Sequence, residues 1–116
     1  MTVKEVIDEV RVDLDDNETT QRISDEEFLP WARECQTYIA SNFPEILLND
    51  EGTKMNAVVT LSTVNTAFTI GDDTREAIKA YLSHRWHLCE KNDRRDEKFA
   101  ASEFARFLFL MGGGRG

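Results

Sequence analysis

The sequence predicts one mainly α-helical domain, a four-helix bundle-like fold with a small β-hairpin excursion between the second and third helices. Two observations favour this class. Apolar residues recur at helical spacing in four separate segments. Between residues 44 and 72 that spacing gives way to short β-branched and aromatic runs, which are typical of strands. At 116 residues the chain has the length of a single domain. We assign residues 1–111 to this domain and residues 112–116 to a flexible glycine-rich tail.

The first helix is expected over Val3–Leu14. Thr2 and Glu5 stand three residues apart, the spacing of a capping box in which each side chain satisfies an amide at the helix start. An apolar stripe with a period near 3.6 follows, and acidic residues occupy the opposite face. The polar residues 15–19 end this helix.

The second helix is expected over Asp25–Asn42. Ser24 and Glu27 repeat the capping-box spacing, and the acidic residues of the first turn suit the helix dipole. Pro30 lies beyond that turn, where a proline removes one backbone hydrogen bond and favours a kink. Pro44 follows the expected end.

The middle of the chain is expected to form the hairpin, with the turn at Val64–Thr66. Residues 58–61 and 68–70 supply the two β-rich runs. An isolated two-stranded hairpin is marginally stable in water. It must therefore pack on the helices or on another chain.

The third helix is expected to start within residues 72–74 and to continue to Cys89. The charged residues 91–96 form a connection that is either a break or a continuation of this helix. The fourth helix is expected from about Phe99 to Gly112. Across the four helices the expected core consists of Val6, Ile7, Val10, Phe28, Trp31, Tyr38, Ile78, Tyr81, Leu82 and Trp86.

The last helix is apolar on more than one face. Phe104, Phe107 and Met111 share one side, whereas Phe109 and Leu110 point elsewhere. A terminal helix of this kind needs a second burial partner. Either the hairpin covers the extra face, or another subunit does. The residues that we expect at such a contact are Phe104, Phe107, Phe109, Leu110, Met111, Arg94 and Arg95.

Charge is distributed unevenly. The chain has 22 acidic and 14 basic residues and a net charge of −8. Residues 1–50 hold 13 acids and 4 bases, whereas residues 51–116 hold 9 acids and 10 bases. This balance argues against nonspecific wrapping of nucleic acid, which relies on Lys and Arg. In a ring, the acidic helices of one copy would face the basic connection of the next, around Arg94 and Arg95.

No catalytic residue, metal site or cofactor site is expected. His84 and His87 lie one helical turn apart, but zinc needs further ligands and no second cluster accompanies them. The acidic run that begins at Asp13 lacks the glycine and the glutamate of a calcium loop. Cys35 and Cys89 are expected to be reduced thiols in helices. No segment has the length of an apolar membrane span.

Three stretches of the chain resemble the head-to-tail adaptor (connector) proteins of tailed bacteriophages. Ile23–Trp31, which follows an opening helix of the form TVKEVIDEVR, is similar to the entry into the family's second helix. Phe68–Asp73 and the residues after it resemble the next helix, and Lys91–Phe104 resembles the last one. The residues that carry the match in the third helix are Ala77, Ile78, Tyr81, Leu82 and Arg85.

The resemblance implies a non-enzymatic structural protein that assembles as a ring, commonly of twelve copies, beneath the portal protein. Such a ring extends the DNA channel, without sequence-specific binding, and is a platform for a tail or stopper protein. Its location would be the neck of the virion, and the host cytoplasm before assembly. Two alternatives stay open. One is another small phage assembly protein, such as a head-closure or tail-completion factor. The other is a small helical nucleic-acid-binding regulator that uses Lys91, Arg94, Arg95 and Lys98.

Overall fold

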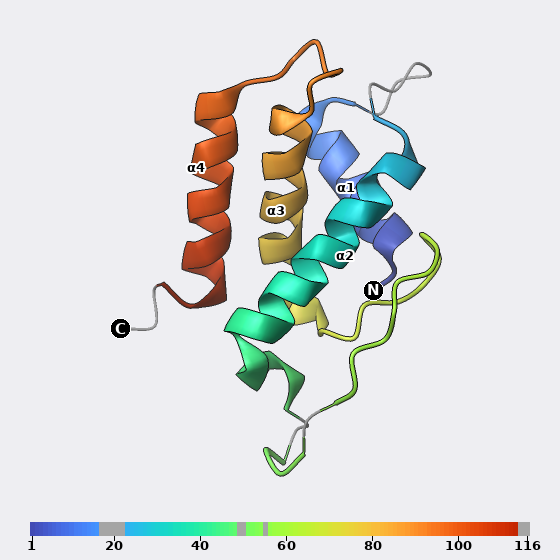
Figure 1. Cartoon of the computed structure of the whole chain (residues 1–116), viewed down its shortest axis with the longest axis vertical. Coiled ribbons are helices and arrows are strands. Elements are labelled where there is room, and N and C mark those ends of the chain that lie inside the picture. The colour runs from blue at the N-terminus through green and yellow to red at the C-terminus, as the bar shows by residue number, and fades with distance from the viewer. Residues whose placement is uncertain (17–22, 49–50, 55, 114–116) are drawn as a thin grey trace.

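A computed structural model describes residues 1–16, 23–48, 51–54 and 56–113. It contains four α-helices, three short helical turns and no strand within these residues. Helix α3 lies centrally, with α4 on one side and α1 and α2 on the other (Figure 1). The helices are α1 (Val3–Leu14), α2 (Asp25–Asn42), α3 (Arg75–Leu88) and α4 (Glu97–Leu108), with the turns η1 (Pro44–Leu47), η2 (Asp72–Thr74) and η3 (Phe109–Gly113).

The sequence-predicted bounds of α1 and α2 agree with the structure. Ser24 and Glu27 form the complete capping box, with the Ser24 side chain accepting from the Glu27 amide and the Glu27 carboxylate from the Ser24 amide. Helix α2 continues without interruption through Pro30. None of the helices in the described residues combines the length and the apolar character that a membrane crossing requires.

The charged connection between the third and fourth helices is a break. Asn92 is buried, and its side-chain amide donates to the Trp86 carbonyl at 2.8 Å, which caps the end of α3. The Asp96 amide donates to the His87 carbonyl at 3.0 Å, and the Asp96 carboxylate accepts from the Phe99 amide at 3.0 Å. Helix α4 therefore turns back against α3. The predicted tail beyond residue 113 lies outside the described residues.

The predicted β-hairpin does not form among the described residues. Its turn is present at residues 64–65, but the main-chain groups of residues 64, 66 and 68 bond to the start of the chain, and among the described residues no main-chain bond joins them to residues 58–61. The amides of Val3 and Lys4 donate to the Thr66 and Val64 carbonyls at 3.1 and 2.7 Å, and a single antiparallel bridge joins Thr2 to Ala67. The N-terminus competes successfully for the main-chain groups that a hairpin would have used.

The core lies where α1, α2 and α4 converge on α3. Trp86, Phe28, Ile7 and Phe107 are among its largest fully buried side chains. Trp31 and Tyr38, also expected in the core, are half-buried and pack against it. The other expected core residues are buried, namely Val6, Val10, Ile78, Tyr81 and Leu82.

Candidate interaction surface

The apolar end of the chain divides into a buried side and an exposed side. Phe107 and Met111 are buried in the chain's own core. Phe109 and Leu110 are 64% and 41% exposed. We call Phe109 and Leu110 the C-terminal corner. The chain from residue 107 to residue 114 carries no charged side chain, so this corner is an uncharged as well as an apolar surface.

An aromatic cluster fixes α4 so that the C-terminal corner faces outward. The Phe107 ring meets the Tyr81 and Tyr38 rings edge-on, with centroids 5.1 and 5.6 Å apart. Phe104, which is half-buried, lies 4.9 Å from the His84 ring and also meets Tyr38. Edge-on aromatic pairs of this kind favour one rotational setting of the helix. After α4, the wider turn η3 brings Gly112 against the Phe43 ring, 3.5 Å from the position that a Cβ atom would take.

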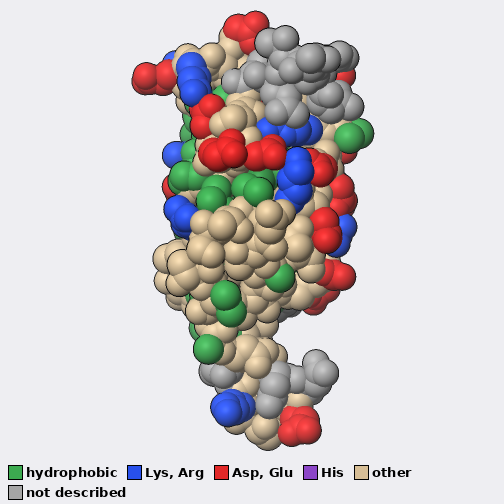
Figure 2. Space-filling model, turned by 90° about the vertical axis from the view of Figure 1, so that its right-hand side faces the viewer, with side chains coloured by type: hydrophobic (Ala, Val, Ile, Leu, Met, Phe, Trp, Pro, Cys, Tyr) green, Lys and Arg blue, Asp and Glu red, His purple; other side chains and the backbone are tan. Residues whose placement is uncertain are grey.

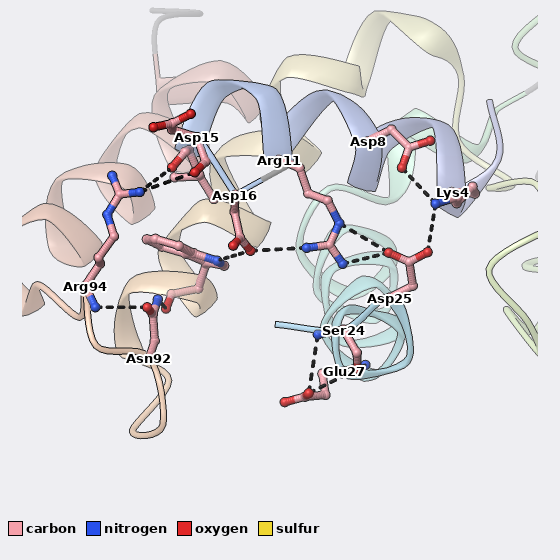
Figure 3. Close-up of polar contacts among 12 residues, drawn as sticks. Lys4, Asp8, Arg11, Asp15, Asp16, Ser24, Asp25, Glu27, Asn92 and Arg94 are labelled. Atoms are coloured by element: carbon pink, nitrogen blue, oxygen red, sulfur yellow. Dashed lines mark hydrogen bonds and ion pairs between the residues drawn. The ribbon is translucent and has the colours of Figure 1, made fainter. Parts of the chain in front are cut away.

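The basic residues that we expected at a subunit contact are engaged within the chain. Arg94 donates to the Leu14 carbonyl at 3.0 Å, and its guanidinium lies 5.5 Å from the centre of the Trp86 ring (Figure 3). Arg95 pairs with Glu97 at 2.5 Å. Neither arginine is part of an uncompensated basic patch. Arg94 instead satisfies the carboxyl end of α1.

A buried ionic network, which sequence reasoning missed, ties α1 to α2 and α3. Arg11 and Asp16 are only 2% and 1% exposed, and their side chains pair at 3.1 Å. The Trp86 indole N–H donates to the same Asp16 oxygen at 3.1 Å, and Arg11 donates to Asp25 at 2.7 Å (Figure 3). Burial raises the pKa of Asp25, but hydrogen bonds from Lys4 and Arg11 outweigh it and hold that pKa below its usual value.

The backbone at the end of α1 puts Asp16 into this network. Asp15 adopts the left-handed conformation, with φ of 55°, which aspartate tolerates better than most residues. The Asp16 amide then donates to the Arg11 carbonyl at 2.8 Å, and the Asp15 amide to the Val12 carbonyl at 3.2 Å. This pair of bonds is a Schellman ending. It turns the chain so that Asp16 faces inward.

Basic residues of the second half of the sequence pair with acidic residues of the first half inside the chain. Arg75, at the start of α3, pairs with Glu9 of α1 at 2.5 Å. Lys79, one turn later, pairs with Asp13 of α1 at 3.0 Å. Lys91 of the connection pairs with Glu27 of α2 at 2.5 Å. Bases of the second half thus bind acids of the first half.

An uncharged face lies on the side of the molecule opposite α4. Residues 55–71 contain no charged side chain, although 31% of the whole chain is charged. Residues 56–60 are exposed, with Val58 and Val59 at 46% and 52%. Figure 2 shows this face, where acidic and basic side chains lie around a broad tan and green area. We call residues 56–60 the uncharged strip. The run without charge was the signal in the sequence that could have identified it.

Two side chains of α2 hold the uncharged strip in place. The Gln36 amide donates to the Val59 carbonyl at 2.8 Å and accepts from the Thr69 amide at 3.1 Å. Arg33 donates to the Leu61 carbonyl at 2.6 Å. The Val59 amide donates to the Thr69 hydroxyl at 2.7 Å. The segment is therefore ordered by side chains and not by strand pairing.

The groups considered for chemistry serve the fold. His84 contacts the Ala100 carbonyl through its Nδ1 atom at 2.9 Å. His87, expected to be partly exposed, is buried against Trp86 and Phe99. Burial raises the pKa of the Cys35 thiol, which disfavours the reactive thiolate. Within the described residues no group of three or more His, Cys, Asp or Glu side chains is placed to hold a metal ion.

Comparisons with known proteins place no further constraint on these surfaces. No protein-family model, curated protein or solved structure matches the chain.

Proposed function

We propose that the chain is a structural head-to-tail adaptor of a tailed bacteriophage. Copies assemble as a ring beneath the portal, extend the DNA channel and present a platform for a tail or stopper protein. The resemblance in residues 23–31 and 68–104 names the family. The mainly helical fold, with the matched segments on α2, α3 and α4, is compatible with it.

The single observation that carries the proposal is the presence of two separate exposed, uncharged surfaces. One is the C-terminal corner and the other is the uncharged strip, and they lie at opposite edges of the molecule (Figure 1). Exposed apolar surface gathered at one place often marks a site of protein–protein contact. A subunit of a closed ring needs two different patches, one for each neighbour.

The charge of the chain also suits a DNA channel. A channel through which DNA slides should not bind phosphate groups tightly. Acidic residues predominate, and Lys91, Arg94 and Arg95 are engaged within the chain. These contacts disfavour the nucleic-acid-binding regulator, because three of the four bases in its proposed cluster bond to groups of the same chain. A gel shift with duplex DNA tests that alternative, which predicts binding that weakens steeply with salt and requires Arg94 and Arg95.

Portal binding tests the adaptor directly. Purified chain is added to portal rings of the parent phage, and co-sedimentation and negative-stain microscopy detect a bound second ring. Phe109→Asp should abolish the added ring while the variant keeps the wild-type circular dichroism spectrum. Val12→Asp, a substitution at an equally exposed valine on α1, is the matched control and should bind normally. Absence of portal binding by the wild-type chain at every salt concentration contradicts the proposal. A head-closure or tail-completion factor would instead bind only to portal rings that already carry an adaptor.

A further inference from the structure

We infer that neighbouring copies contact each other head to tail, with the C-terminal corner of one copy seated on the uncharged strip of the next. This inference rests on the proposed ring and names its contact. The corner consists of Phe109 and Leu110, and the strip consists of residues 56–60. The occupant of the strip is thus a second copy of this chain.

Charge favours this pairing of surfaces. Two copies that each carry a net charge of −8 repel each other, and the cost falls when the touching surfaces carry no charge. Residues 55–71 form the longest uncharged stretch of the sequence, and residues 107–114 carry no charge either. Each of them provides large exposed apolar side chains, Val58 and Val59 on one side and Phe109 and Leu110 on the other. Contact between the two buries apolar surface without burying an unpaired charge.

The main chain of the uncharged strip also favours contact with a neighbouring copy. The amide and the carbonyl of Val59 both bond to groups on the inner side of the strip, from Thr69 and Gln36. In an extended chain, the main-chain groups of alternate residues point to opposite sides. The amides and carbonyls of Val58 and Thr60 accordingly face outward, and none of them bonds to another described residue. The strip therefore presents open main-chain donors and acceptors to a neighbouring copy.

The positions of the two surfaces favour a ring over a closed pair. The molecule measures 46 × 32 × 19 Å, and α4 and the segment that contains the strip lie at the two edges of the middle dimension (Figure 1). A contact between two different patches repeats from copy to copy and closes when the rotation permits. Pairing of two identical strips would instead end at a dimer.

The strip is already ordered before any neighbour arrives. From α2, the side chains of Gln36 and Arg33 donate hydrogen bonds to the carbonyls of Val59 and Leu61. Docking onto an ordered segment avoids the entropy cost of fixing a loop, so the contact gains more from the same buried area. The aromatic cluster around Phe107 orders the opposite surface in the same way.

Cross-linking of paired single-cysteine variants tests the contact. Val59→Cys and Phe109→Cys are made separately in a Cys89→Ser background, because Cys35 is buried whereas Cys89 is partly accessible. The two proteins are mixed at high concentration and treated with a short bismaleimide. A head-to-tail contact gives mixed Val59→Cys/Phe109→Cys dimers several-fold faster than either variant alone. A mixture of Phe109→Cys with Val12→Cys, whose valine is 65% exposed outside both surfaces, measures the rate of random collision.

The outcomes separate the contact from the function. Mixed dimers that form no faster than the Val12→Cys control overturn the contact, even where portal-bound rings assemble. Preferential cross-linking of Val59→Cys with itself also overturns it, since that result means that strips pair with each other. Selective mixed dimers without any portal binding support the contact and contradict the adaptor function.

Discussion

Breaking the buried Arg11–Asp16 pair from one side should destabilise the fold strongly. Asp16→Ala removes the carboxylate that accepts from both the Arg11 guanidinium and the Trp86 indole N–H. Breaking a buried ion pair from one side costs about 3–5 kcal/mol, because the remaining charge is left without its partner. Arg11 keeps its hydrogen bonds to Asp25, which places the loss at the lower end. We expect a loss of about 3 kcal/mol in the free energy of unfolding, or about 10–20 °C in Tm for a domain of this length.

Urea unfolding followed by tryptophan fluorescence measures this loss, because Trp86 lies in the network itself. Asp8→Asn is the matched control on the same helix. Its carboxylate is exposed and, among the described residues, pairs only with Lys4 at 2.9 Å, so the cost should stay below about 0.5 kcal/mol. The double variant Arg11→Met, Asp16→Leu should recover most of the stability that Asp16→Ala loses, because no unpaired charge stays buried. A loss below about 1 kcal/mol for Asp16→Ala, or a double variant no more stable than the single one, would refute the reasoning.

Three further predictions concern single side chains. Burial lowers the pKa of His87 in the folded chain, so as the pH falls the unfolded chain takes up the histidine proton at a higher pH than the folded chain does. The free energy of unfolding should therefore fall as the pH drops below the ordinary histidine value of about 6.5. Denaturation at several pH values should show a smaller fall in this free energy for His87→Leu. Phe107→Ala should lower the free energy of unfolding by about 3–5 kcal/mol, because it opens a cavity in the core. Phe109→Ala should change the same free energy, measured by thermal unfolding, by less than about 0.5 kcal/mol. Equal effects would contradict the assignment of Phe107 to the buried side and Phe109 to the exposed side. Arg94→Ala should lower stability by about 1–2 kcal/mol through the lost bond to the Leu14 carbonyl and the contact with Trp86, while Arg95→Ala should be almost neutral in the same assay.

Local signals in the sequence predicted the helices well, and non-local competition explains the main error. The Ser24–Glu27 box and the apolar stripes are encoded within a few residues, so the bounds of α1 and α2 follow from the sequence. The hairpin depended on which segment would pair with residues 64–68. Their main-chain groups bond to Met1, Val3 and Lys4, sixty or more positions away, and no periodicity within residues 58–70 carries that information.

The candidate surfaces were predicted only in part for a related reason. Phe109 and Leu110 were identified because they fall off the apolar stripe of their own helix, which is a local property. The burial of Asp16 depends on the left-handed turn at Asp15 and on Trp86 seventy residues later, so an acidic run that suggested a solvated loop contains a core residue. The uncharged strip was overlooked because its β-branched residues were interpreted as a strand of the hairpin.

The charge pattern of the sequence leads to a last prediction, which separates two models of assembly. The uneven distribution of charge suggested that acidic helices of one copy meet basic residues of the next. Within the fold those charges are already paired, Arg75 with Glu9 and Lys79 with Asp13. Contact between copies is then left to the uncharged surfaces, whose attraction salt does not screen. Raising the salt concentration from about 0.05 to 0.5 M shortens the Debye length from roughly 14 to 4 Å and weakens the repulsion between copies of net charge −8.

Cross-linking between Val59→Cys and Phe109→Cys should therefore hold constant or increase across this range. Charge reversal by Arg95→Glu, a substitution outside both uncharged surfaces, should leave it unchanged. A contact between acidic helices and basic residues would show the opposite behaviour, because its attraction falls as salt rises and reverses with the charge. Loss of cross-linking at high salt would mean that charged residues make the contact between copies. It would contradict a contact made by the uncharged surfaces around Phe109 and Val59.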